Sequence, residues 1–89
     1  MLIRKHIQFY GRVQGVGFRF HATYKAQFLG LTGWVRNCYD GSVEMEVQGE
    51  PELIDDLVRH LHRQRFVRID RMDEESIDLK EESTFKEKW

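Results

Sequence analysis

One stretch of the chain combines glycines and an arginine in a spacing that suits anion binding. It runs from Gly11 to Arg19 and reads Gly-Arg-Val-Gln-Gly-Val-Gly-Phe-Arg. Glycines let a backbone approach a ligand closely and turn its amide N–H groups inward. A helical pattern begins at Phe18, and the N-terminus of a helix adds unpaired N–H groups and positive dipole charge. Arg19 in that first turn opposes the dipole unless an anion lies between them, so the segment predicts a phosphate-sized anion site.

From these residues alone a second interpretation stays open. A glycine-rich connection between a strand and a helix is often only a tight turn, and an arginine in a first helical turn is often a surface residue. Two widespread phosphate motifs are also missing. Gly15-Val16-Gly17 is not followed by a third glycine at position 20, and no Gly-Lys-Ser/Thr sequence is present.

Both this segment and a second one resemble known signatures. Gly11 to Arg19 closely resembles the first signature of the acylphosphatase family, and Gly33-Trp34-Val35-Arg36-Asn37 resembles the second. Asp40-Gly41 follows at the expected place. The resemblance implies an enzyme that hydrolyses the carboxyl–phosphate bond of acyl phosphates and needs neither a metal nor a cofactor. Its small-molecule partners would be an acyl phosphate and inorganic phosphate.

The resemblance also assigns roles to single residues. Arg19 would bind the phosphoryl group, and Asn37 would position the attacking water. Cys38 stands where the family often has threonine, which would remove a hydroxyl that helps to orient the Asn37 amide. The loop residues that would bind phosphate through their backbone are Val13, Gln14, Gly15, Val16, Gly17 and Phe18.

Elementary chemistry is compatible with so few polar groups. A carboxylate leaving group has a pKa of about 4 to 5 and needs no proton donor. Phosphoryl transfer then depends on positioning and on charge neutralisation, and an arginine fork can bind two phosphoryl oxygens at once. No metal site is expected, because Cys38 is the single cysteine and two histidines at positions 60 and 62 cannot share a helix face. His21 lies near the loop, where we expect an ordinary surface role.

Hydrophobic periodicity predicts the elements that carry these residues. The predicted order is strand, helix, strand, strand, helix, strand, which is typical of a ferredoxin-like α+β sandwich with an antiparallel sheet and two helices on one face. A single domain is expected over residues 1–89, and a short edge strand is expected near its end. The expected segments are 3–10 (strand), 18–29 (helix), 31–37 and 43–48 (a hairpin), 51–63 (helix), an extended stretch after Gln64, and 83–89 (edge strand).

Composition narrows the class of partner. Fourteen basic and fifteen acidic residues leave a formal net charge of −1, which argues against a broad nucleic-acid or membrane surface. The N-terminus lacks the apolar core of a signal peptide, so we expect a cytoplasmic protein. An RNA-recognition domain of the same fold would need aromatic residues on its central strands, whereas the third strand carries Glu44 and Glu46. A non-catalytic, acylphosphatase-like module that binds phosphate within a larger assembly remains the alternative function.

Three aromatic residues follow one side of the first predicted helix. Phe20, Tyr24 and Phe28 recur at helical spacing, opposite the face that should pack on the sheet. We expect their partial burial against a neighbouring helix or loop in a monomer. The alternative is an exposed stripe that supports a weak dimer.

Overall fold

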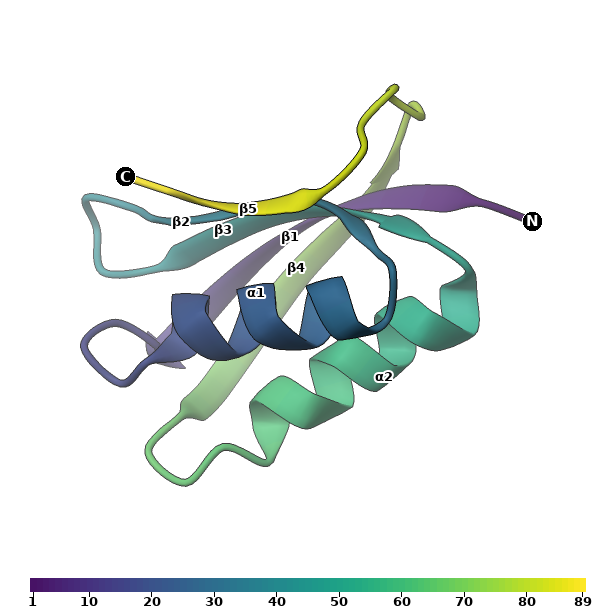
Figure 1. The fold of residues 1–89 in the computed structure, drawn as a ribbon. Coiled ribbons are helices and arrows are strands. Elements are labelled where there is room, and N and C mark those ends of the chain that lie inside the picture. The colour runs from purple at the N-terminus through teal and green to yellow at the C-terminus, as the bar shows by residue number, and fades with distance from the viewer.

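Five strands form one sheet, and two helices cover one of its faces, in the computed structural model of residues 1–89 (Figure 1). The order of strands across the sheet is β4-β1-β3-β2-β5. The predicted ferredoxin-like α+β arrangement is confirmed. The elements are β1 (Ile3–Arg12), α1 (Phe18–Phe28), β2 (Thr32–Asn37), β3 (Val43–Gly49), α2 (Pro51–His62), β4 (Arg68–Ile77) and β5 (Phe85–Lys88).

The sheet is mixed, so the prediction of a purely antiparallel sheet is wrong at one edge. β5 pairs in parallel with β2, whereas the pairs β1–β3, β1–β4 and β2–β3 are antiparallel. The reason lies in where β4 ends. Ile77 stands opposite Arg4, which stands opposite Gln48, which stands opposite Thr32 at the start of β2. The connection 78–84 crosses the sheet at this end, so β5 starts beside the start of β2 and runs in the same direction.

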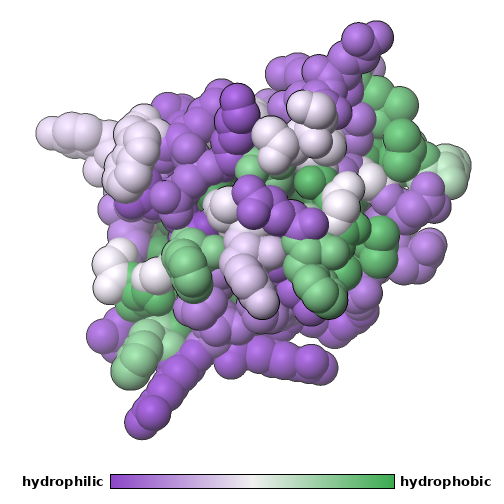
Figure 2. All heavy atoms as spheres, viewed as in Figure 1, coloured by the Kyte–Doolittle hydropathy of each residue, from purple (hydrophilic) through white to green (hydrophobic).

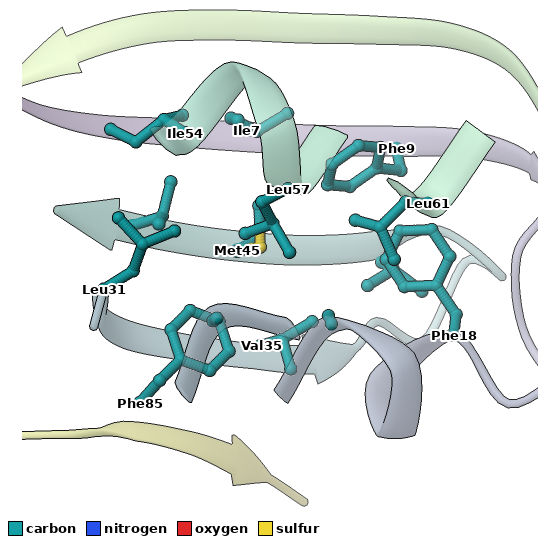
Figure 3. Packing of buried hydrophobic residues seen from close by; sticks show 14 of the residues in the cluster. Ile7, Phe9, Phe18, Leu31, Val35, Met45, Ile54, Leu57, Leu61 and Phe85 are labelled. Atoms are coloured by element: carbon teal, nitrogen blue, oxygen red, sulfur yellow. The ribbon is translucent and has the colours of Figure 1, made fainter. Parts of the chain in front are cut away.

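The hydrophobic core lies between the helices and the sheet (Figure 3). Alternate residues of the strands point toward the helices, which is why Ile7 and Phe9 are buried while Gln8 between them is not. Small side chains at Ala22 and Ala26 let α1 lie close to the sheet, and each large side chain buried beneath the helices contributes about 1.5–3 kcal/mol. The largest apolar side chains of this cluster are Ile7, Phe9, Phe18, Leu31, Met45, Ile54, Leu57, Leu61 and Phe85.

A buried arginine lies on the opposite face of the sheet. The Arg4 side chain is 0% exposed, and its Nε and Nη2 donate to Glu46 Oε1 at 3.0 and 2.8 Å. Its Nη1 donates to Gln48 Oε1 at 3.2 Å and to Glu82 in the 78–84 connection. Gln48 also exchanges hydrogen bonds with the backbone of Lys80. Arg4 and Gln48 therefore fasten the connection that delivers β5 to its edge.

Two histidines meet where the helices pack together. The rings of His21 on α1 and His60 on α2 lie 6.1 Å apart in an edge-on arrangement. Burial lowers the pKa of His60 below its ordinary value, and the positive charges of Lys25, His21 and Arg63 lower it further. The neutral form of His60 is therefore favoured in the folded protein.

The aromatic stripe on α1 is mostly exposed, so the expected partial burial is wrong. Phe20, Tyr24 and Phe28 are 65, 61 and 73% exposed, because α2 packs along another side of α1 and leaves this one uncovered. Figure 2 looks onto the helix-covered face and shows apolar patches set among polar side chains. Neither helix is long and apolar enough to cross a membrane.

The Arg4 contacts lead to a test of stability. Arg4→Met should lower the free energy of unfolding by about 2–4 kcal/mol, because it leaves Glu46 and Glu82 without their shared cation under a covering loop. Lys5→Met is the matched control. Lys5 lies on the same strand as Arg4, but its ion pair with Glu74 is partly solvated and should contribute at most about 1 kcal/mol to the free energy of unfolding. Urea unfolding of both variants measures the difference. Equal losses would contradict a special role for Arg4.

The lowered pKa of His60 leads to a test of pH dependence. The unfolded chain binds a proton on this ring near its ordinary pKa of 6.5, whereas the folded protein does so only at lower pH. Stability linked to His60 is thus complete above pH 6.5 and is lost as the pH falls below it. His60→Asn should reduce the fall in Tm between pH 7.5 and 5.5, whereas His62→Asn, at an exposed position on the same helix, should not. A His60→Asn variant with the wild-type Tm profile would contradict this linkage.

Candidate functional site

The loop between β1 and α1 has a backbone shape that suits an anion. Gly15 and Gly17 have positive φ angles of 73° and 79°, while Val16 between them does not. Such alternation of left-handed and right-handed residues turns successive N–H groups toward one concave side. A side chain at either glycine position would strain this shape by about 1 kcal/mol or more, which explains the two glycines in the segment.

The amide groups of this loop have no partners within the protein. None of the backbone N–H groups from Gln14 to Phe20 donates a hydrogen bond to another backbone carbonyl, and the first helical bond joins His21 N–H to the Gly17 carbonyl at 3.0 Å. No side chain caps α1, and its first turn contains no acidic residue. The positive end of the helix is therefore uncompensated and attracts an anion.

Buried side chains hold both ends of the loop. Val13 and Phe18 are almost fully buried, and the Phe18 ring packs on Phe9 with 4.9 Å between ring centres. Val16 also packs partly against the core. The backbone between these anchors is confined to the surface, where Gly15 and Gly17 are exposed.

A hollow of about 280 Å³ brings the main predicted site residues together. The β1–α1 loop, the β2–β3 turn and the C-terminal end of β5 lie at the same end of the molecule (Figure 1). Asn37 is the last residue of β2, two positions beyond the buried Val35, so its side chain lies on the helix side of the sheet. The hollow is lined by Val13, Gly15, Gly17, Phe18, Arg19, Phe20, Asn37, Glu87 and Trp89.

The Arg19 side chain is restrained from the C-terminal edge of the sheet. Its Nη1 donates to the Lys88 carbonyl at 3.1 Å, and its guanidinium lies 4.2 Å from the centre of the Trp89 ring. The sequence reasoning missed Glu87, Lys88 and Trp89 as neighbours of the site. No local pattern could have found them, because the contact depends on the parallel pairing of β5 with β2.

Gln14 and Val16 are the two predicted loop residues that do not line the hollow. The Gln14 side chain points elsewhere: its Nε2 donates to the carbonyls of Cys38 and Ser42 at 2.7 and 2.9 Å. These carbonyls belong to the turn that follows Asn37. Gln14 thus ties the glycine loop to the segment that carries the asparagine.

Cys38 lies on the other face of the sheet from the hollow. Its Sγ accepts a hydrogen bond from Gln8 Nε2 at 3.3 Å, and the same amide donates to Ser42 Oγ at 2.7 Å. Ser42 in turn donates to Asp40 from its hydroxyl and its N–H, and these bonds lower the pKa of the Asp40 carboxyl. The thiol therefore stabilises the turn and does not contact the Asn37 amide.

The structure contains no cluster of three or more histidine, cysteine, aspartate or glutamate side chains arranged to hold a metal ion. The residues with polar side chains that line the hollow are instead Arg19, Asn37 and Glu87, beside the unpaired amides of the loop. Amides and a guanidinium bind oxyanions, and a neutral amide side chain can orient a water molecule. The arrangement can hold a phosphoryl group.

Comparisons with known proteins agree with this geometry. A sequence profile of the acylphosphatase family matches residues 5–87. An acylphosphatase from Bifidobacterium longum is 55% identical over 60 residues, which are 67% of this chain and 62% of that protein. The crystal structure of acylphosphatase from Bacillus subtilis matches over all of both chains, with a TM-score of 0.91 and 30% identity.

One similar structure is part of a much larger protein. Full-length HypF, in its phosphate- and nucleotide-bound form, matches all of this chain with a TM-score of 0.87 and 28% identity, but the match covers only 12% of HypF. The alignment with the Bifidobacterium protein likewise spans about three fifths of that relative's length. Because the family profile covers nearly the whole chain, the chain belongs to the acylphosphatase family.

Proposed function

We propose that the protein hydrolyses acyl phosphates to a carboxylate and inorganic phosphate without a metal ion. The observation that carries the proposal is the run of unpaired backbone amides from Gln14 to Phe20, of which Gly15, Gly17 and Phe18 line the same hollow as Arg19 and Asn37. Membership of the acylphosphatase family supports the same class of reaction.

The reaction needs a nucleophile and charge neutralisation. A water oxygen bonds to phosphorus while the bond from phosphorus to the carboxyl oxygen breaks, and its electron pair leaves with the carboxylate. The proton lost by the water passes to the phosphate product. The leaving carboxylate is a weak base with a pKa of about 4 to 5, so no general acid is required. Stabilising charge on the phosphoryl oxygens then becomes the main task of the protein.

Arg19 is the proposed ligand of the phosphoryl group. A guanidinium can donate two parallel hydrogen bonds to two phosphoryl oxygens, and the loop amides can bind the third. The contacts with Lys88 and Trp89 already restrain the side chain at the edge of the hollow. Less side-chain entropy is therefore lost when the phosphoryl group binds.

Asn37 is the proposed ligand of the attacking water. Its side chain lines the same hollow as Arg19, and the Gln14 bonds to the following turn hold the end of β2 against the loop. An amide oxygen can accept a hydrogen bond from water and fix it in line with the bond to be broken. A neutral side chain does this without repelling the anionic substrate.

A second function remains a candidate because of the HypF match. That protein contains a region of this fold within a much longer chain. The present chain would in that case bind phosphate or an acyl phosphate as part of a larger assembly, without turnover. Hydrolysis of benzoyl phosphate by the isolated chain distinguishes the two functions.

The first test of the proposal combines a chelator with phosphate binding. Benzoyl phosphate should be hydrolysed equally fast with and without EDTA, because Arg19 and amides supply the positive charge. Inorganic phosphate should inhibit competitively and raise Tm by binding the folded state. Activity that EDTA removes and a divalent ion restores would contradict the mechanism. A Tm that is indifferent to saturating phosphate would contradict the assignment of the loop.

The second test separates the roles of Arg19 and Asn37. Arg19→Ala should abolish turnover and weaken phosphate binding, and Arg19→Lys should recover little because a point charge cannot bind two oxygens in parallel. Asn37→Ala should lower kcat by about 10²–10³-fold while phosphate affinity stays near the wild-type value. Calorimetry with phosphate and kinetics with benzoyl phosphate measure both quantities.

A matched control and a contrary result complete this test. Arg12→Ala removes an exposed arginine two residues before Gln14, outside the hollow, and should change neither kcat nor phosphate affinity by more than about twofold. If Asn37→Ala weakened phosphate binding as severely as Arg19→Ala, then Asn37 would be a substrate ligand and its proposed role would be wrong.

A further inference from the structure

A second hollow adjoins the hollow lined by Arg19, along the outer side of α1. This second hollow, called the α1–β5 groove below, has a volume of about 210 Å³ and lies between α1 and β5. Phe20 and Glu87 line both hollows, so the two lie next to each other. The remaining residues that line the second hollow are Thr23, Tyr24 and Gln27.

A flat apolar surface begins directly beside the proposed phosphate ligand. Phe20 follows Arg19 in the chain, and its exposed ring lies nearly parallel to that of Tyr24, with 6.4 Å between centres and 15° between planes. The loop amides, Arg19 and Asn37 are taken up by the phosphoryl group and the water. An acyl group attached to that phosphoryl group must therefore contact what is left of the lining, which is Phe20, Glu87 and Trp89.

Glu87 adds a negative charge to this junction. It lies two residues beyond the buried Phe85 on β5, so its side chain is on the helix side of the sheet. Its carboxylate takes part in none of the ion pairs of the protein. An unneutralised carboxylate at this position repels a second negative charge on a bound acyl group.

We propose that Phe20 and Glu87 determine which acyl phosphates the protein accepts. Phe20 holds apolar, flat acyl groups at the mouth of the α1–β5 groove, and Glu87 disfavours acyl groups that carry a free carboxylate. The preferred substrate class is thus an acyl phosphate with an uncharged, aromatic or similarly apolar acyl group. This inference rests on the proposed hydrolysis and specifies the substrate of the same site.

Three substrates that differ only in the acyl group test the inference. They are benzoyl phosphate, acetyl phosphate and succinyl phosphate, the last with a free carboxylate. Phe20→Ala should lower the ratio of kcat/KM for benzoyl over acetyl phosphate by about tenfold, as expected for the loss of one apolar contact surface. Glu87→Gln should raise the ratio for succinyl over acetyl phosphate by about three- to tenfold, and this gain should shrink at high salt.

Two control variants match these changes elsewhere. Phe28→Ala removes an exposed aromatic ring from the same helix, and Glu81→Gln removes an exposed carboxylate from the 78–84 connection; neither residue lines the two hollows. Both controls should leave the two ratios unchanged. Tm values confirm that all four variants are folded.

The outcomes separate the inference from the function on which it rests. Unchanged ratios in Phe20→Ala and Glu87→Gln would overturn the acyl-group assignment and leave the hydrolytic function standing. An equal loss for all three substrates in Phe20→Ala would also overturn it, because Phe20 would then act on Arg19 and not on the acyl group. If the wild-type protein hydrolysed none of the three, both the function and the inference would be wrong.

Discussion

The burial of Val13 and Phe18 is the constraint on which the site depends. These two side chains enter the core on either side of a four-residue stretch, and Phe18 is fixed further by its ring contact with Phe9. Burial of a phenylalanine contributes about 1.5–3 kcal/mol, which offsets the cost of holding glycines in a tight turn with unpaired amides. The same contacts that build the core therefore hold the anion-binding backbone in place before any ligand arrives. Such preorganisation is what electrostatic stabilisation of a phosphoryl group requires.

Two sets of polar contacts join segments that are distant in the sequence. Gln14 joins the loop to the turn after Asn37, and Arg4 fastens the 78–84 connection on the opposite face of the sheet. Because that connection sets where β5 begins, the Arg4 contacts indirectly bring Lys88 and Trp89 to the Arg19 side chain. A buried ion pair outside the site thus helps to shape it. The hollow is assembled from three chain segments that only the tertiary fold brings together.

The sequence predicted local features better than long-range ones. The alternation around Ile7 and Phe9 and the glycines at 15 and 17 express constraints within a few residues, and the elements they predict are present. The parallel pairing of β5 and the burial of Arg4 depend on partners 42 or more residues away, and periodicity carries no information about them. An arginine on the polar side of a strand is normally solvated, so its burial under a loop could not be expected. The prediction that the aromatic stripe on α1 would be partly buried was wrong for a related reason, since nothing in the sequence showed which side of α1 would remain uncovered.

The distribution of charge in the hollow has consequences for turnover. Arg19 and the N-terminus of α1 concentrate positive charge at the proposed phosphoryl position, while Glu87 stands at the rim without an ionic partner. An acyl phosphate presents a neutral carbonyl beside Glu87, but hydrolysis converts this group into a carboxylate. If the acyl group lies where we propose, the Glu87 charge repels the carboxylate product more strongly than the substrate. Repulsion that grows as the bond breaks opposes catalysis as long as the carboxylate stays close to Glu87. In a loose, largely dissociative transition state most of this charge develops on the carboxylate while it is still close to phosphorus. Glu87 in the proposed position would therefore slow bond cleavage somewhat and favour release of the carboxylate once the bond is broken.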